Sequence, residues 1–419
     1  MKIAFVSQPW NRVVPPVQAG SLAIWTYQIA RRLARSHQVT VYSRRAPGDE
    51  RLQQHEGVEY RRFGLLADRC LRKLLEGFSR FRSPERPTFA SPLYYPRYIR
   101  QVAADIRARQ CDLVHIFNFS QFVPVVRAFN PGARIVLHMQ CEWLTQLDRK
   151  MIARRLEGAD AIIGCSRCIT DAIRARFADF AGPCETIFNG VDPERFSGRA
   201  GKPDSEDKRE RRLLFVGRVS PEKGVHVLLD ALRIVADRFS QARLDVVGPI
   251  GECERDFVVA LCDDERVAQL ASFYDGRGYG SHLKEQWESL GLQDRVTWHG
   301  AVPHRDLPAL YRGADVLINP SLSEPFGITV IEAMASETPV VASRVGGMIE
   351  TVVDGKTGLL VEAGDAKALA EAICRLLSDA ELCRSMGKAG RERVMGYFSW
   401  DRIAEGLLRL CERTMGLGS

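Results

Sequence analysis

The sequence predicts an α/β protein with two doubly wound, Rossmann-like domains. Short apolar, strand-like segments alternate with longer helix-like patterns over the first 190 residues, and a second series of the same kind begins at Leu213. This alternation is typical of parallel sheets with helices on both faces. The stretch from Gly198 to Arg212 between the two series is polar, contains glycine and proline, and has no apolar periodicity. It therefore predicts an exposed linker between two domains.

The strands of both series are placed by their apolar runs and by the turn residues beside them. In the first series, strands are expected at Lys2–Ser7, Gln38–Tyr42, Leu113–Phe117, Arg134–His138 and Asp160–Cys165. In the second series, they are expected at 213–217, 243–247, 295–299, 315–318, 339–342 and 358–361. The segment Ser21–Ser36 carries its apolar residues on one side and predicts the first long helix. Ligands of such sheets bind beyond the carboxyl ends of the strands, so functional residues are expected there.

Composition is that of an ordinary globular protein, with 26% charged and 45% hydrophobic residues in a chain of 419. No apolar run approaches the roughly 18 residues of a membrane-spanning helix. The opening Met1–Ser7 is a short strand-like run without a cleavage site, so no signal peptide is predicted and the protein is expected in the cytoplasm. Eleven cysteines, an odd number, favour reduced thiols over a disulfide framework.

Cys165 and Cys168 form the one C-x-x-C of the sequence, between a predicted strand and a predicted helix. A redox site is one interpretation. A structural role is favoured, because Ser166 between them is a typical helix N-cap. No second C-x-x-C lies near it to complete a zinc site.

Positive charge is concentrated in the N-terminal half. The formal net charge is +7, of which residues 1–200 contribute +13 and residues 201–419 contribute −6, and residues 61–110 alone carry +8. Such asymmetry predicts an anionic partner for the N-terminal half.

Part of this basic region has an apolar stripe at helical spacing. Within Leu65–Arg82 the stripe comprises Leu71, Leu74, Leu75, Phe78 and Phe81, with Arg69, Arg72, Lys73, Arg80 and Arg82 around it. Two interpretations stay open: the stripe packs on the protein's own core, or it lies peripherally on an anionic membrane, at the inner face. Three tyrosines interleaved with arginines follow at 94–100 and suit sugars or lipid phosphates. No nucleic-acid-binding motif accompanies them, so nucleic acid is not expected.

The segment Glu324-Pro325-Phe326-Gly327-Ile328-Thr329-Val330-Ile331-Glu332 places two carboxylates eight residues apart around the start of a helix. Pro325 and Gly327 end any preceding element, and the residues from Ile328 onward predict a mostly apolar helix. Free N–H groups at a helix start bind anions. A diphosphate can rest there, with Glu324 and Glu332 on either side to accept hydrogen bonds from sugar hydroxyls. Two solvated glutamates are the alternative, which the apolar neighbours of Glu332 disfavour.

Arg218 and Lys223 flank a second loop, between a predicted strand and helix. Gly217 and Gly224 beside them allow a ligand to approach closely. Arginine grips a phosphate with two parallel hydrogen bonds, and lysine acts as a point charge. The sequence has no Asp-x-Asp motif in a convincing strand-end context, so no metal is expected. Instead, the two cations and the helix-start amides would stabilise a departing diphosphate.

With these motifs, the chain resembles the family 4 glycosyltransferases, which are retaining enzymes of the GT-B fold. The residues from Glu324 to Glu332 resemble the E-x7-E signature of the family, and 213–224 resemble its strand–loop–helix with Arg and Lys. Further similarity covers 314–321, 345–347, 355–360 and Phe188–Asp192. The similarity is dense in the C-terminal half and scattered in the N-terminal half.

The resemblance implies a domain map, with two Rossmann-like domains facing each other across a cleft. Residues 1–197 are expected to form the acceptor-binding domain, 198–212 the linker and 213–395 the donor-binding domain. The helix at 396–419 is expected to return to the N-terminal domain, since Tyr397–Trp400 resembles the crossover of the family. Glu252–Gly291 is longer than the usual connection, and a lengthened helical hairpin is favoured over an insertion near the cleft.

The resemblance also implies the ligands and the site residues. A nucleoside diphosphate sugar is the expected co-substrate, with no cofactor, and the acceptor is a glycan, a lipid-linked sugar or a small molecule. Glu324 and His138 are the expected catalytic residues, since the family often places a histidine near the transferred sugar. Gly20 is expected to touch the donor, although the family commonly has two adjacent glycines where this chain has Ala19-Gly20. The other expected donor-binding residues are Arg218, Lys223, Phe326, Gly327, Ile328, Thr329 and Glu332.

Other function classes remain open at this point. A sugar-nucleotide epimerase or a phosphorylase can share the fold, and a silent nucleotide-sugar-binding subunit is a third class. The complete set of Arg218, Lys223, Glu324 and Glu332 favours transfer. No lysine-centred pyridoxal phosphate motif is present.

Overall fold

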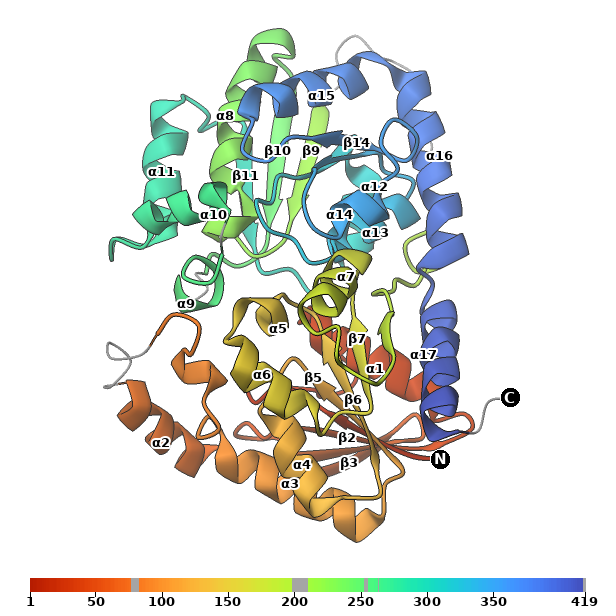
Figure 1. Ribbon diagram of the computed structural model, residues 1–419. Coiled ribbons are helices and arrows are strands. Elements are labelled where there is room, and N and C mark those ends of the chain that lie inside the picture. The colour runs from red at the N-terminus through yellow and green to blue at the C-terminus, as the bar shows by residue number, and fades with distance from the viewer. Residues whose placement is uncertain (77–82, 198–209, 252–254, 263, 417–419) are drawn as a thin grey trace. The chain divides into compact units, whose positions relative to one another are not determined.

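The computed structural model describes residues 1–76, 83–197, 210–251, 255–262 and 264–416 and divides into two compact α/β units (Figure 1). One unit comprises Met1–Asn189 and Trp400–Ser419, and the other comprises Gly190–Ser399. Each unit has its own mainly parallel sheet with helices packed on it. The predicted fold class, two doubly wound α/β units, is confirmed.

The sheet of the first unit has eight strands in the order β3-β4-β2-β1-β5-β6-β7-β8. They are β1 (Lys2–Val6), β2 (Gln38–Arg44), β3 (Leu52–His55), β4 (Val58–Phe63), β5 (Leu113–Phe117), β6 (Arg134–Met139), β7 (Ala161–Gly164) and β8 (Cys184–Thr186). All neighbours are parallel except β3, which pairs antiparallel with β4 at the sheet edge. The five predicted strands are confirmed to within two residues at each end.

Three strands, β3, β4 and β8, are not among those that the sequence pattern predicts. In β4, Val58, Tyr60 and Arg62 are buried and alternate with less buried residues. An arginine on the buried face breaks the apolar pattern that identifies a half-buried strand. Edge strand β3 is mostly polar, and β8 is only three residues long.

The helices of the first unit pack on both faces of its sheet. They are α1 (Ser21–Leu33), α2 (Leu66–Glu76), α3 (Pro96–Arg109), α4 (Phe122–Phe129), α5 (Trp143–Gln146), α6 (Arg149–Leu156), α7 (Arg167–Arg176) and α17 (Trp400–Met415). Helix α1 ends three residues before the predicted Ser36. The Ser166 hydroxyl accepts a hydrogen bond from the Ile169 N–H at the start of α7, which confirms the predicted N-cap. Helix α17 packs beside α1, and its Trp400 and Leu407 join the same core as Phe5 of β1.

The described part of the predicted basic helix is α2, which covers Leu66–Glu76. Positions 77–82, with Phe78, Arg80, Phe81 and Arg82, lie outside the described residues. Of the stripe residues in α2, Leu74 is 67% exposed, whereas Leu71 and Leu75 are partly buried. Leu66, beside the stripe, is 80% exposed. The Asp68 carboxylate is buried and accepts hydrogen bonds from the N–H groups of Arg97 and Tyr98 at the start of α3. None of the described helices is both long and apolar enough to cross a bilayer.

The second unit has six parallel strands in the order β11-β10-β9-β12-β13-β14. They are β9 (Arg211–Val216), β10 (Ala242–Val247), β11 (Val296–Gly300), β12 (Val316–Asn319), β13 (Val340–Ser343) and β14 (Leu359–Val361). The six predicted strands are confirmed to within two residues at each end. Arg211 and Arg212, expected in the linker, belong to β9 because their backbone pairs with Ala242 and Arg243. The rest of the predicted linker, 198–209, lies outside the described residues.

The helices of the second unit follow its strands in alternation. They are α8 (Val225–Arg238), α9 (Arg255–Val258), α10 (Glu265–Ala268), α11 (Tyr279–Ser289), α12 (Leu307–Gly313), α13 (Ile328–Ala335), α14 (Met348–Thr351), α15 (Ala366–Ser378) and α16 (Ala380–Tyr397). Glu252–Gly291 is not a lengthened helical hairpin. Its described part forms α9, α10, a 3-10 helix at Gln269–Phe273 and then α11, which packs on α8.

The strand order of the second unit reverses between β9 and β12. The chain adds β10 and β11 on one side of β9, and then β12, β13 and β14 on the other. The chain after β9 therefore leads towards one edge of the sheet, and the chain after β12 leads towards the other. In open α/β sheets, this topological switch point is where ligands bind. Both predicted motifs, with Arg218 and Lys223 after β9 and Glu324 after β12, lie there.

Candidate functional site

The loop after β9 packs directly on the loop after β12. Gly224 has a φ of +70°, and a Cβ placed on it would lie 2.1 Å from the Pro320 carbonyl oxygen. The Leu322 N–H also donates to the Glu222 carbonyl oxygen over 2.8 Å. A glycine is therefore required at 224 by the protein backbone itself, and the close approach of a ligand there stays a prediction.

Lys223 and Glu324 form an ion pair between the two loops. Lys223 Nζ lies 2.8 Å from Glu324 Oε2, with side chains 19% and 15% exposed. Burial would lower the pKa of Lys223, but the Glu324 and Glu222 carboxylates raise this pKa above its ordinary value. Lys223 therefore stays an ammonium at neutral pH and is aimed at the predicted catalytic carboxylate.

The same carboxylate occupies the start of helix α13. Glu324 Oε1 accepts hydrogen bonds from the N–H groups of Gly327 and Phe326, over 3.2 and 3.4 Å. These two amides are thus not the free anion-binding groups that the sequence predicted. Ile328 and Thr329, the first residues of α13, are partly exposed, and helix geometry leaves their N–H groups without partners inside the helix.

The Phe326 side chain is part of the core. It is buried, and its ring meets the Phe398 ring edge-on with centroids 5.7 Å apart. This packing fixes the backbone between Glu324 and α13. A donor contact predicted for Phe326 can therefore involve only its backbone.

Two glycines, Gly346 and Gly347, hold the other side of the Glu324 loop. A Cβ on Gly346 would lie 2.2 Å from the Glu324 carbonyl oxygen, and one on Gly347 would lie 2.3 Å from the Pro325 carbonyl oxygen. The Gly347 N–H donates to the Glu324 carbonyl oxygen over 3.1 Å. The glycine pair therefore sets the path of the loop that carries the carboxylate.

Arg218 is held by a residue that the sequence analysis did not single out. Its Nη2 donates to Glu222 Oε1 over 2.9 Å, and its Nε donates to the Ser220 hydroxyl over 3.2 Å. The Glu222 side chain is buried, and while burial raises its pKa, Lys223 and Arg218 lower this pKa below its ordinary value. The signal available in the sequence was a glutamate directly before the predicted Lys223.

Glu332 lies in a small buried box. Its Oε1 accepts from His304 Nε2 and its Oε2 from the Tyr311 hydroxyl, both over 2.7 Å. The Phe196 ring packs against both partner rings. Glu332 is thus anchored by protein donors. A donor hydroxyl would have to share these oxygens, each of which has a second lone pair.

His138 lies in the first unit, at the carboxyl end of β6, and is fully buried. Its Nδ1 is 3.0 Å from His115 Nε2, and its Nε2 is 2.9 Å from Gln140 Nε2. Burial lowers the pKa of His115 to about 3, and burial together with His115 lowers the pKa of His138. Both imidazoles are therefore neutral at pH 7. The contact of His138 with a transferred sugar stays a prediction.

Gly20 precedes α1 and is exposed, with a φ of +82° that favours glycine. Its donor contact also stays a prediction. Within each unit taken by itself, the structure brings Lys223 together with Glu324, Arg218 with Glu222, and His138 with His115. Among the described residues, no three His, Cys, Asp or Glu side chains gather as a metal-binding group.

Comparisons with known proteins match both units. Residues 22–195 match the family model described as Glycosyltransferase Family 4, and residues 200–393 match the model described as Glycosyl transferases group 1. Spore coat protein SA of Bacillus subtilis (strain 168) is 26% identical over 434 aligned positions, which cover 99% of this chain and 100% of that protein.

Solved structures resemble the whole chain as well. Sucrose-phosphate synthase from Thermosynechococcus elongatus is 25% identical, with a TM-score of 0.71 and coverage of 99% of both chains. HepE from Anabaena in complex with UDP-glucose is 20% identical, with a TM-score of 0.68 and coverage of 99% of this chain and 100% of that one.

Proposed function

The chain belongs to the family 4 glycosyltransferases and has the GT-B fold, and we propose that it moves a sugar from a nucleoside diphosphate sugar to an acceptor hydroxyl with retention of anomeric configuration. The observation that carries this proposal is the convergence of Arg218, Lys223 and Glu324 at the switch point of the second sheet. The two cations suit the diphosphate of such a donor, and the anchored carboxylate suits its sugar.

The cations supply the charge stabilisation. When the anomeric bond breaks, negative charge develops on the departing diphosphate, and fixed cations beside it lower the barrier. Lys223 is held by Glu324 and Arg218 by Glu222, so both are in place before the donor binds. This arrangement supports a reaction that needs no divalent ion.

Glu324 is suited to orienting the sugar and stabilising its positive charge. Its two oxygens already accept from Lys223 and from two backbone amides, which fixes the direction of the carboxylate. The remaining lone pairs can accept from sugar hydroxyls. Three donors on one carboxylate also weaken it as a nucleophile, which favours a front-side displacement over a covalent glycosyl intermediate.

In that displacement, the bond from the anomeric carbon to the diphosphate oxygen breaks and a bond to the acceptor oxygen forms on the same face. The acceptor proton passes to an oxygen of the departing diphosphate, so no protein base is needed for it. The electron pair of the broken bond stays on the diphosphate, where Arg218 and Lys223 stabilise it.

The donor is tested first by binding. The purified protein is screened by thermal shift against uridine, guanosine and adenosine diphosphate sugars, since a ligand raises the unfolding temperature according to its affinity. The UDP-glucose bound to HepE makes uridine diphosphate sugars the first choice. The proposal predicts a shift with at least one donor, which Arg218→Ala reduces.

Turnover is then measured with the selected donor and with glycan, lipid-linked and small-molecule acceptors. The proposal predicts product with the donor's anomeric configuration by NMR, in the presence of excess chelator. Unchanged acceptor-dependent turnover in both Arg218→Ala and Glu324→Ala would refute the site. An inverted product would refute the retaining mechanism, and loss of turnover with chelator would refute the metal-free one.

A further inference from the structure

A cavity of about 410 Å³ opens beside the ends of β2 and β4 in the first unit, and four arginines line it: Arg45, Arg51, Arg62 and Arg97. Its volume falls in the range of about 300–1,000 Å³ that is typical of ligand pockets. The remaining lining comprises Gln101 and apolar or glycine positions, with no carboxylate. The lining therefore carries a large excess of positive charge.

Arg62 is the buried member of this set, with 1% of its surface exposed. Its guanidinium donates to the carbonyl oxygens of Val13 and Glu50 and to Gln53 Oε1. None of these acceptors is a carboxylate. The nearby Asp49 carboxylate is bound by Arg12. These acceptors thus orient the Arg62 guanidinium, which forms no direct ion pair among the described residues, although the Asp49 and Glu50 charges act on it from nearby. Buried charges are usually paired directly.

Arg51 and Arg97 are exposed at the mouth of the cavity. Within the described ranges, neither forms an ion pair, and the Arg45 side chain donates only to the Asp49 carbonyl oxygen. The backbone of Arg97 is nevertheless fixed, because the Asp68 carboxylate accepts its N–H over 2.9 Å. The Arg97 guanidinium at the mouth is therefore carried by backbone whose position is fixed.

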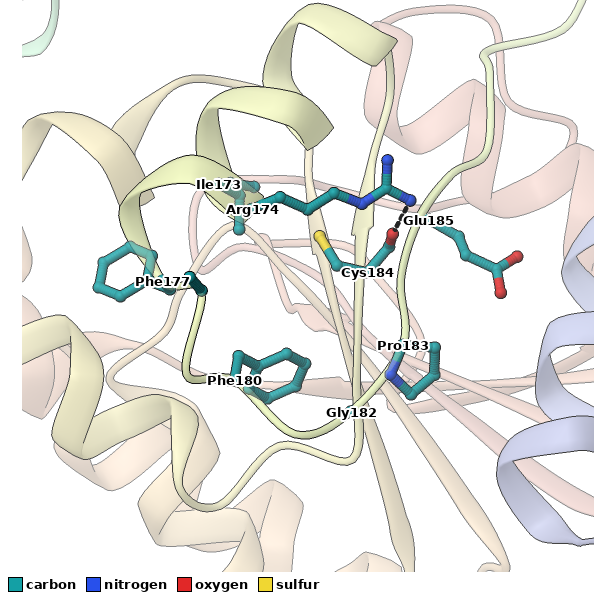
Figure 2. A pocket seen from close by; sticks show the side chains of 9 residues that line it. Ile173, Arg174, Phe177, Phe180, Gly182, Pro183, Cys184 and Glu185 are labelled. Atoms are coloured by element: carbon teal, nitrogen blue, oxygen red, sulfur yellow. Dashed lines mark hydrogen bonds between the residues drawn. The ribbon is translucent and has the colours of Figure 1, made fainter.

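A second cavity in the same unit has a lining without excess positive charge. It has a volume of about 310 Å³ and is lined by Phe177, Phe180, Arg174 and Glu185 among others (Figure 2). The Arg174 guanidinium donates to the Cys184 carbonyl oxygen and pairs with Asp171. One arginine with one lining glutamate leaves no excess charge, so this cavity is not an anion site.

An exposed leucine, Leu66, belongs to the lining of the arginine-lined cavity. In the described part of Met1–Asn189, the exposed large hydrophobic residues are Leu52, Leu66, Leu74 and Leu93. Leu66 lines the cavity, and Leu52 follows Arg51 directly in the chain. Cationic and apolar surface together suit a phosphoryl group that is attached to a less polar body.

We propose that this cavity binds a phosphoryl group, carried either by a soluble ligand or by a lipid headgroup. Guanidinium groups match phosphoryl oxygens with paired hydrogen bonds, and several together favour an anion with more than one charge. Four strand spacings of about 4.8 Å separate β4 from β6, so the cavity lies on the order of 20 Å from His138 along the sheet edge. It is thus a site of its own, and it does not depend on the donor assignment.

The test uses inorganic pyrophosphate and isothermal titration calorimetry on the full chain carrying Arg218→Ala, which weakens the proposed donor site. In this background, Arg51→Gln with Arg97→Gln removes two charges from the cavity mouth. The control, Arg107→Gln with Arg154→Gln, removes two charges from exposed helical positions of the same unit. We expect saturable binding in the background and in the control, and affinity at least about tenfold weaker in the cavity variant. Equal affinity in all three proteins, or no saturable binding in the background, overturns the proposal.

A second measurement identifies the carrier of the phosphoryl group. Flotation is compared with vesicles of phosphatidylcholine alone and with added phosphatidylglycerol. Flotation that needs the anionic lipid, is displaced by pyrophosphate and is lost in the cavity variant assigns the site to a lipid headgroup. Pyrophosphate binding without flotation assigns it to a soluble ligand. When Arg51→Gln and Arg97→Gln are made with Arg218 intact, the thermal shift caused by nucleotide sugars is expected to equal that of the wild type. Failure of the cavity proposal is therefore distinguishable from failure of the proposed function.

Discussion

Lys223 and Glu324 lie 101 positions apart in the chain, yet their side chains share a 2.8 Å hydrogen bond at the point where the strand order of the second sheet reverses. Each of the two residues holds the other in place. Glu324 raises the pKa of Lys223, and Lys223 occupies one oxygen of the carboxylate. The two predicted roles, charge stabilisation and sugar orientation, are thus coupled in one pair.

The coupling predicts non-additive kinetics. Lys223→Ala and Glu324→Ala are each expected to lower kcat/KM by about a hundredfold or more. The double variant is expected to lose little more than the worse single variant, because each change already disrupts the pair. The measurement is a double-mutant cycle on initial rates, with the exposed Lys356→Ala as the control. Losses that multiply in the double variant would contradict the coupling.

The buried box around Glu332 predicts a cost in stability. Tyr311→Phe removes one of the two side-chain donors to this carboxylate and leaves Oε2 buried without its partner. The free energy of unfolding is expected to fall by about 1–3 kcal/mol, which lowers Tm by several degrees. Thermal denaturation checks this, and Tyr397→Phe is the matched control because Tyr397 is exposed. Equal Tm values for the two variants would show that Tyr311 does not support Glu332.

The contact between the loops after β9 and β12 predicts a strong effect of one added methyl group. Gly224→Ala places a Cβ against the Pro320 carbonyl oxygen at a φ of +70°. The expected loss of stability is above about 1 kcal/mol, together with reduced turnover. Gly396→Ala is the control, because no atom lies within 4 Å of its added Cβ. Wild-type turnover in Gly224→Ala would show that the loop contact does not set the site.

The buried histidine pair predicts acid sensitivity. In the folded protein, the pKa of His115 is lowered to about 3 by burial, and the pKa of His138 is lowered as well. The unfolded chain, with histidine pKa values near 6.5, binds more protons between these limits. Stability is therefore complete above about pH 6.5 and falls as the pH drops towards 3, by up to about 1.4 kcal/mol per pH unit for each histidine. Urea denaturation from pH 7 to pH 5 measures the slope. His115→Gln is expected to flatten it, and an unchanged slope would contradict the assignment.

The sequence predicted the framework of both sheets because parallel strands covered on both faces are continuous apolar runs. Leu113–Phe117 is an example, with all five residues buried. The prediction failed where a polar residue is buried, as at Arg62 in β4, because local pattern cannot show which backbone oxygens will satisfy a guanidinium. Glu324 and Lys223 were both singled out, but not as partners. Their contact depends on the packing of loops that are far apart in sequence.

The amides of Phe326 and Gly327 illustrate a second limit. A helix start preceded by glycine predicts backbone N–H groups that are free to bind a ligand. In the structure, the N–H groups of Phe326 and Gly327 instead donate to the Glu324 carboxylate. Glu324 lies outside the helix, because the N-cap position of α13 is Gly327 and no side chain caps it. The contact of Glu324 with these amides depends on the path of the loop, which the local pattern does not show. Glu332 is a similar case, since its partners His304 and Tyr311 come from another segment of the chain.

The return of α17 to the first unit affects the order in which the protein can form. Trp400, Ile403, Leu407 and Leu410 complete a core whose other members come from the first 190 residues. A growing polypeptide therefore releases all of Gly190–Ser399 from the ribosome before the earlier unit receives its last apolar layer. A fragment that stops at Asn189 lacks that layer and leaves the apolar residues beneath it exposed to solvent, so an expression fragment of the first unit should carry the closing helix grafted to its end.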